Sequence, residues 1–129
     1  MSTFERLSAY QPYGLAALRI ITALLFIEHG TMKLFGFPIA GMPSLPPLML
    51  FAALLEVIGG LLILVGLLTR PVAFLLAGEM AVAYFMAHAP RSFYPVANEG
   101  DAAILFCFVF LYLFFSGPGA FSVDNRKTA

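Results

Sequence analysis

Charged residues are scarce in this sequence. Only 11% of its 129 residues are charged, 7 basic and 7 acidic, so the formal net charge is zero. Nucleic-acid-binding proteins carry a basic excess, and this chain has none, so we expect no nucleic-acid partner. Hydrophobic residues make up 61% of the chain, against about 45–50% in an ordinary soluble domain. Mean hydropathy is +0.94. The composition predicts a small integral membrane protein without room for a soluble enzyme domain.

Cysteine is nearly absent as well. Cys107 is the single cysteine, so an internal disulfide, a Cys-x-x-Cys pair and a zinc or iron–sulfur ligand set are all excluded. The spacing of an H-E-x-x-H zinc site is also missing, and we expect no metal. His29 and His88 could in principle ligate a haem. The two histidines are expected to lie at depths in the membrane that differ by a helical turn or more, which argues against haem.

A cleavable leader is not expected either. The first 13 residues contain Glu5, Arg6 and Pro12, and the apolar run that follows has the length of a full span and no small-x-small cleavage site. We therefore expect this run to be retained as a helix.

Four apolar runs are present, separated by proline and glycine. They predict an all-α four-helix membrane bundle of antiparallel up-down topology, a single domain over residues 1–129, with spans at about 14–35, 47–68, 71–89 and 101–116. The short turn between the second and third spans predicts that these two helices lie side by side and antiparallel. We expect the polar tail to fray beyond Asp124.

Basic residues flank the spans unevenly. One side carries Arg6, Arg70, Arg126 and Lys127. The other carries Lys33 and Arg91. The positive-inside rule then places both termini in the cytoplasm. This predicts a multi-pass protein of a bacterial-type plasma (inner) membrane.

Polar residues inside the first two spans point to a functional site, because ionisable groups are expensive in lipid and persist where partners or water satisfy them. His29 and Lys33 share one face of the first helix, and Glu28 borders it. Glu56 lies beside Gly59 on the second helix, where small residues let helices approach closely. We expect Glu56 to be the most buried acid. A purely structural role, with Glu56 accepting hydrogen bonds from Lys33 or His29, remains open.

The last two spans add three candidates. Glu79 lies near mid-membrane and is expected either to bond Arg19 or another polar group, or to exchange protons. His88 is nine residues from Glu79, on the opposite face, and in the same leaflet as His29. Asp101 opens the fourth helix, where the helix dipole favours an acid, and it either caps that helix or closes the polar cluster from outside.

The order of these motifs resembles the DoxX family, also called DoxX/DoxD-like, of small four-span membrane proteins. The matching segments cover nearly the whole chain: Leu18-Arg19-Ile20, His29-Gly30, Lys33-Leu34-Phe35-Gly36, Glu56-Val57-Ile58-Gly59-Gly60-Leu61, Gly66-Leu67-Leu68-Thr69-Arg70, His88-Ala89-Pro90, Phe93-Tyr94-Pro95, Asn98-Glu99-Gly100-Asp101 and Gly117-Pro118-Gly119 with Ser122 and Asp124.

The resemblance implies a membrane bundle linked to oxidoreductase systems. Relatives in this family are associated with quinone-linked sulfur oxidation, with quinone or catechol stress and with oxidative-stress complexes that contain soluble partners. This chain differs at Glu28 and Glu79, where the family usually has apolar residues, and at Glu99-Gly100-Asp101, where Gly-Gly-Glu is common.

The leading hypothesis is a membrane subunit of an oxidoreductase system that handles a quinone or other small redox-active molecule in a polar pocket in the outer half of the bundle. His29, Lys33 and Glu56 are the predicted catalytic residues, in general acid–base roles. Glu28, His88, Asp101 and Glu79 are the predicted ligand-binding residues.

Two alternatives remain open. The chain could be a non-enzymatic scaffold or assembly partner, whose Phe-rich surface binds another subunit or a second copy. It could also be a proton or small-solute path, as Glu79 near mid-span indicates. Membrane lipid is an expected partner in every case.

Overall fold

The computed structural model describes residues 1–41 and 43–126, which form helices and no strand. In chain order the elements are α1 (Thr3–Leu7), η1 (Ser8–Tyr10), α2 (Gln11–Phe35), α3 (Pro47–Val65), α4 (Thr69–Ala83), a π-helical turn η2 (Tyr84–His88), η3 (Ala89–Arg91), α5 (Pro95–Asn98), α6 (Asp101–Ser116) and α7 (Val123–Arg126). Lys127, one of the basic residues used to predict orientation, lies outside the described residues.

Three helices in the described part of the chain are long and apolar enough to cross a membrane: Thr3–Phe35, Pro47–Val65 and Thr69–Arg91. The fourth apolar helix, α6, is shorter at 16 residues. Large apolar side chains such as Phe51, Phe74 and Phe108 are exposed along these helices, where they can contact lipid. The described residues thus confirm the all-helical prediction and include three helices that could span a membrane.

The expected helix boundaries need two corrections. The second helix ends at Val65 rather than at residue 68, because Gly66 adopts a left-handed conformation with φ 70°. α4 begins at Thr69 rather than at residue 71, because the Asp124 carboxylate accepts hydrogen bonds from the backbone amides of Leu68 and Thr69, both at 2.9 Å. A side chain distant in sequence therefore caps this helix.

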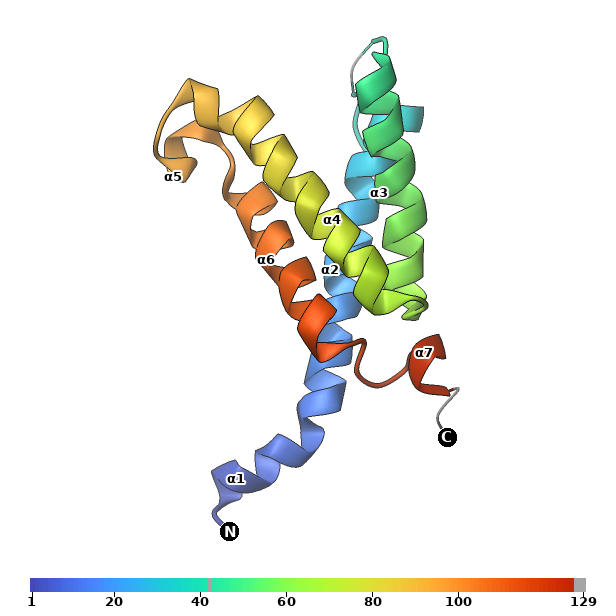
Figure 1. The fold of residues 1–129 in the computed structure, drawn as a ribbon, viewed down its shortest axis with the longest axis vertical. Coiled ribbons are helices and arrows are strands. Elements are labelled where there is room, and N and C mark those ends of the chain that lie inside the picture. Colours follow the sequence, from blue (N-terminus) through green and yellow to red (C-terminus); the bar gives the residue numbers. More distant parts are fainter. Residues whose placement is uncertain (42, 127–129) are drawn as a thin grey trace.

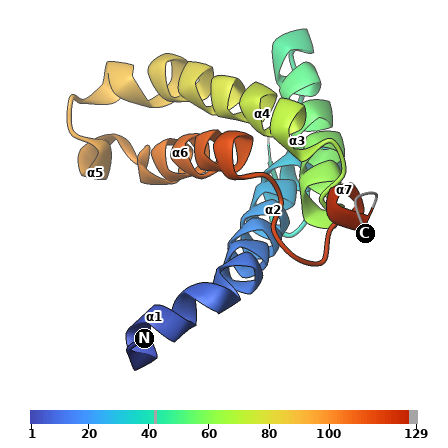
Figure 2. The ribbon, with the colours of Figure 1, turned by 60° about the horizontal axis from the view of Figure 1, so that its bottom comes forward.

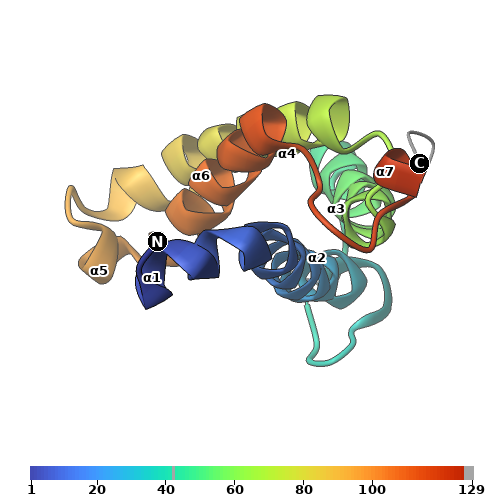
Figure 3. The ribbon, with the colours of Figure 1, turned by 90° about the horizontal axis from the view of Figure 1, so that it is seen from below.

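The helices pair as two hairpins (Figure 1). α2 packs along α3, and α4 packs along α6. Views from two further directions show the same pairing, with α4 and α6 running side by side away from α2 and α3 (Figures 2 and 3). α3 and α4 were expected to lie side by side, but they contact each other over a smaller area. They meet at the pairs Gly59–Leu76 and Glu56–Glu79 and diverge beyond them.

The core lies where the two hairpins meet. Phe26, Ile63, Leu76, Phe110 and Leu113 are fully buried there, one or two from each of the four long helices. Phe26 and Phe110 pack edge to face, with ring centroids 4.9 Å apart. This contact joins the first hairpin to the second.

The chain end closes the bundle at the end that carries both termini, which we call the termini end (Figure 1). Residues 117–126 form a C-terminal strap across it. Arg19 is fully buried, and its guanidinium donates to four backbone oxygens: Pro118, Ala120 at 3.0 Å, Phe121 at 2.8 Å and Leu64 at 3.5 Å. The strap therefore joins α2 to the end of α3.

Asp124 attaches the strap to α3 and α4. Its backbone amide donates to the Gly66 oxygen at 2.9 Å, and its carboxylate caps α4. The expected fraying beyond Asp124 is wrong as far as Arg126, because Asn125 and Arg126 belong to α7. The Asn125 side chain also donates to the Gly119 oxygen at 2.5 Å. The polar sequence of the tail predicted that it is loose. Hydrogen bonds between Asp124 and residues far away in the sequence hold it in place instead.

Candidate functional site

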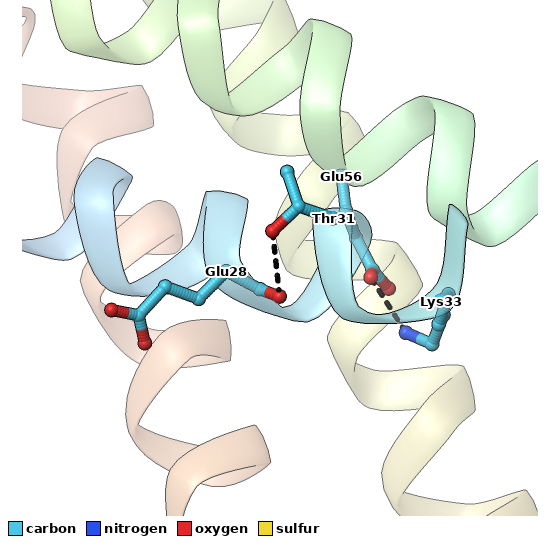
Figure 4. A network of polar contacts seen from close by, with 4 residues as sticks. All are labelled: Glu28, Thr31, Lys33 and Glu56. Atoms are coloured by element: carbon cyan, nitrogen blue, oxygen red, sulfur yellow. Dashed lines mark hydrogen bonds and ion pairs between the residues drawn. The ribbon is translucent and has the colours of Figure 1, made fainter. Parts of the chain in front are cut away.

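An ion pair joins the first hairpin at the opposite end, which we call the loop end. Lys33 Nζ lies 2.6 Å from Glu56 Oε1, and the two side chains are 15% and 2% exposed. Figure 4 shows Lys33 of α2 and Glu56 of α3 pointing toward each other. A carboxylate this deeply buried requires such a partner. Glu56 is the one buried acid in the described part of the chain, as expected from its glycine-rich face.

A glycine brings these two helices close enough for the pair to form. A Cβ on Gly30 would lie 2.6 Å from Val57 Cγ2 and 3.1 Å from Glu56 Cβ. Any larger residue would push α2 away from α3 just where Lys33 reaches across. Gly60 makes a second close approach, since its added Cβ would lie 2.5 Å from Ile27 Cγ1. The glycines of both helices thus set the spacing of the site.

A cavity of about 170 Å³ lies between the two hairpins beside this ion pair. It is lined by Phe26, His29, Lys33, Glu56, Met80, Ala83, His88, Glu99, Ala102, Ala103 and Phe106. Phe106 forms edge-to-face contacts with Phe26 and with His29, at centroid distances of 5.3 and 5.7 Å. The cavity has aromatic walls and cationic and acidic groups at its rim. Larger, open hollows of about 740 Å³ lie at the termini end.

The size of this cavity limits its guest. An engineered apolar cavity of about 150 Å³ in another protein binds benzene. A cavity of about 170 Å³ therefore has room for one six-membered ring. Imidazole and ammonium groups at its rim can donate hydrogen bonds to oxygens carried by such a ring.

His88 reaches the cavity through the π-helical turn η2. In a continuous α-helix, His88 and Glu79 would point in opposite directions, as the sequence predicted. A π turn pairs residue i with i+5 and so rotates the residues that follow it. The His88 ring stacks on Tyr84 at 6.2 Å, and its Nδ1 lies 2.9 Å from the Asn98 carbonyl oxygen. Because a carbonyl oxygen only accepts, Nδ1 carries the proton and Nε2 is left for a guest.

Asn98 holds this corner together. It is fully buried, and its Nδ2 donates to the Tyr84 hydroxyl at 3.1 Å and to the Ser92 carbonyl at 3.0 Å. Its Oδ1 accepts from the Gly100 amide at 2.8 Å. The sequence analysis assigned Asn98 no role. An asparagine in a loop between two apolar runs gives no local sign of burial, although its place in the Asn98-Glu99-Gly100-Asp101 segment was noted.

Glu79 lies behind Glu56 and does not line the cavity. The carboxyl groups of the two side chains lie close enough to interact. The Glu79 Oε1 atom is buried and has no hydrogen-bond partner. Of the partners considered for Glu79, Arg19 is excluded, since its four recorded bonds go to backbone carbonyls at the termini end.

Two further predicted ligand-binding residues, Glu28 and Asp101, also lie outside the cavity. The Glu28 side chain is exposed and points away from the Lys33–Glu56 pair (Figure 4). It borders a separate hollow of about 150 Å³ that Pro38 and Ile39 also line. Asp101 is exposed in the first turn of α6. Glu99, which the sequence analysis did not assign, lines the cavity instead and pairs with Arg91 at 3.7 Å.

The cavity thus brings together four of the seven predicted site residues, His29, Lys33, Glu56 and His88. Glu79 is attached to the group through Glu56. Within the described residues, no cluster of three or more His, Cys, Asp or Glu side chains could hold a metal ion. The arrangement can donate hydrogen bonds to a small guest and exchange protons with it.

Comparisons with known proteins find relatives that match nearly the whole chain. The chain is 45% identical to an uncharacterized protein of Haemophilus influenzae, over 95% of this chain and 96% of that protein. It is 35% identical to the inner membrane protein YqjF of Escherichia coli, over 88% of this chain and 94% of YqjF. The uncharacterized membrane protein Rv3486 of Mycobacterium tuberculosis is 27% identical, with 93% and 85% covered.

No solved structure matches the chain. The model of the DoxX family matches residues 14–89, which include α3, α4 and most of α2, and so contain His29, Lys33, Glu56, Glu79 and His88. That match covers more than half of the 129 residues. This chain belongs to the DoxX family of membrane proteins.

Proposed function

We propose that the protein binds a small redox-active molecule with one oxygen-bearing ring, such as a quinone or quinol, in the cavity between the hairpins. The observation that carries this proposal is the convergence of His29, Lys33, Glu56 and His88 on a ring-sized space with aromatic walls. Titratable groups that converge in a largely apolar pocket are typical of binding sites.

Each cavity residue has a role in this proposal. His29 or Lys33 donates a hydrogen bond to a ring oxygen, and His88 Nε2 accepts a hydrogen bond from a quinol hydroxyl at the other side of the ring. Glu56 exchanges a proton with the guest as general acid or base. Reduction of a quinone to a quinol needs two electrons and two protons. The residues of this chain transfer the protons, and the electrons come from a partner that carries a redox centre.

The protein is therefore proposed to act as a membrane subunit of an oxidoreductase system. We further propose a single domain over residues 1–129 with four spans, α6 being the fourth. Both termini lie at the same end of the bundle, which supports an even number of crossings (Figure 1). The basic Arg6, Arg70 and Arg126 favour the cytoplasm for that end. The name of YqjF supports the inner membrane as the location.

The test is to purify the protein in mild detergent, extract bound small molecules for mass spectrometry, and measure binding by equilibrium dialysis. A tail-less benzoquinone and a long-tailed ubiquinone serve as probes and separate water-soluble from lipid-borne guests. We expect one ring per chain, with at least tenfold weaker binding in His29→Ala and Glu56→Gln. Glu28→Gln is the matched control, because Glu28 is exposed next to His29, and it should bind as the wild type does.

A scaffold role is the second candidate, and the completed Lys33–Glu56 pair favours it, because this chain satisfies its own buried carboxylate. If the protein is a scaffold, Glu56→Gln lowers its stability, and there is no quinone binding for the substitution to weaken. A protein partner would copurify with the chain, and neither probe would be retained. Absence of both quinones from the wild-type protein, at concentrations that saturate a known quinone site, would favour the scaffold.

A further inference from the structure

Glu79 is a half-buried acid that ring binding does not use. It lies outside the cavity wall, one of its oxygens is buried without a partner, and its carboxyl lies next to that of Glu56. Glu56 in turn accepts from Lys33 Nζ at 2.6 Å. The three side chains form a line from the middle of α4 through α3 to α2.

The charge balance of this line favours one proton on the two acids. Two adjacent carboxylates repel each other and can only accept hydrogen bonds, so a proton on one of them removes the repulsion and lets that group donate to the other. Lys33 supplies one positive charge, which one carboxylate neutralises. With one proton on the pair, the cluster of Lys33, Glu56 and Glu79 is neutral, which is the cheapest state for groups inside a bilayer.

The position of the proton follows from the contacts. Glu56 faces the ammonium group and is therefore better able to hold the negative charge. Glu79 faces Glu56 on one side and has no hydrogen-bond partner at Oε1. Among the described residues, the charged groups that act on Glu79 are Glu56 from α3 and Lys33 from α2, and α6 contributes none.

We propose that Glu79 and Glu56 share a single proton, which resides on Glu79 while Lys33 bonds Glu56 and moves to Glu56 when Lys33 turns to another acceptor. In this step the O–H bond of Glu79 breaks, an O–H bond forms on Glu56, and the negative charge passes to Glu79. No electron is transferred. Glu79 thereby becomes a proton store behind the cavity wall.

This store gives the site a way to respond to a guest. Lys33 and Glu56 line the cavity, so an oxygen that draws Lys33 away also leaves Glu56 without its cation. The proton then reaches Glu56 at the cavity wall, where the guest can take it. This last step rests on the proposed ring binding, whereas the shared proton does not.

Infrared spectroscopy of the ligand-free protein tests the shared proton. A protonated carboxyl has a carbonyl stretch that is separate from the carboxylate bands and shifts in D₂O. At neutral pH we expect the wild type to show this band with the area of one carboxyl per chain. Glu79→Gln should lose it, and Glu28→Gln, the exposed control, should keep it.

Lys33→Met gives an independent result, because without the cation both carboxyls become neutral and the band area should rise about twofold. Size-exclusion chromatography and helical circular dichroism establish that each variant is folded, and the wild-type spectrum is decisive even if a variant fails. The proposal is wrong if the wild type shows no such band, if the band survives Glu79→Gln, or if Lys33→Met leaves its area unchanged. Loss of quinone binding with the band intact would overturn the proposed function alone.

Discussion

At the termini end, one buried arginine binds four backbone oxygens and the C-terminal strap seals the ends of α2, α3 and α4. At the loop end, the hairpins diverge, and Lys33, Glu56, His29 and His88 surround a cavity. Both ends bury charge. At the first, four backbone oxygens accept hydrogen bonds from the guanidinium group, and at the second, room remains for a guest. We infer that the termini end serves stability and the loop end serves binding, and four substitutions test this difference.

Arg19→Ala should have the largest effect. It leaves the carbonyl oxygens of Leu64, Pro118, Ala120 and Phe121 without their donor in a buried site. We expect a loss of at least about 3 kcal/mol in the free energy of unfolding, measured in mixed detergent micelles. Arg70→Ala is the matched control, because Arg70 is exposed and bonds the Phe114 and Phe115 oxygens. It should lose about 1 kcal/mol or less. Equal losses would show that burial of Arg19 does not matter.

Lys33→Met should be milder. It removes the charged hydrogen bond to Glu56, and we expect a loss of about 2 kcal/mol in the free energy of unfolding. In the double variant Lys33→Met/Glu56→Gln, the second change should cost much less than Glu56→Gln costs alone, because the pair is already broken. Additive costs in this double-mutant cycle would mean that the two side chains do not stabilise the fold through each other.

Gly30→Ala tests the helix spacing beneath the ion pair. The new Cβ would clash with Val57 Cγ2 and crowd Glu56. We expect a net loss of about 1–2 kcal/mol after the better helix propensity of alanine is counted, together with weaker ring binding. Gly78→Ala is the control, since a Cβ there meets nothing within 4 Å. It should be neutral or slightly stabilising in thermal unfolding.

Asp124→Ala should have the smallest effect. It removes the acceptor for the Leu68 and Thr69 amides and so uncaps α4. Loss of such a cap costs about 1 kcal/mol. Because the change lies at the termini end, we expect lower stability with unchanged quinone affinity. A change in affinity would mean that the two ends are coupled.

Much of the fold could be predicted from the sequence. The lengths of the apolar runs and the placement of proline and glycine located the long helices to within a few residues, and the glycine-rich face of α3 predicted that Glu56 is buried. The bond from Lys33 to Glu56 was one of the structural roles left open for that acid. These features depend on how residues are spaced along the chain, and the sequence shows that spacing directly.

The candidate site was only partly predictable. Glu28 was predicted to bind the ligand but is exposed outside the cavity, whereas Glu99, which had no predicted role, lines the cavity. His88 lies at the site because of a π turn, and the spacing of apolar residues in the sequence did not indicate that turn. The partners of Arg19 lie about 100 residues away in the strap, apart from Leu64. Contacts at such separations leave no local pattern.

The sequence by itself determined that this is an all-helical membrane protein, because the solvent preference of long apolar runs and the backbone limits of proline and glycine act locally. Only the tertiary structure decided that the helices pair as two diverging hairpins, that Glu79 meets Glu56, and that four candidate residues face one cavity. Those outcomes depend on how the side chains of facing helices fit together, and that fit exists only once the helices have packed.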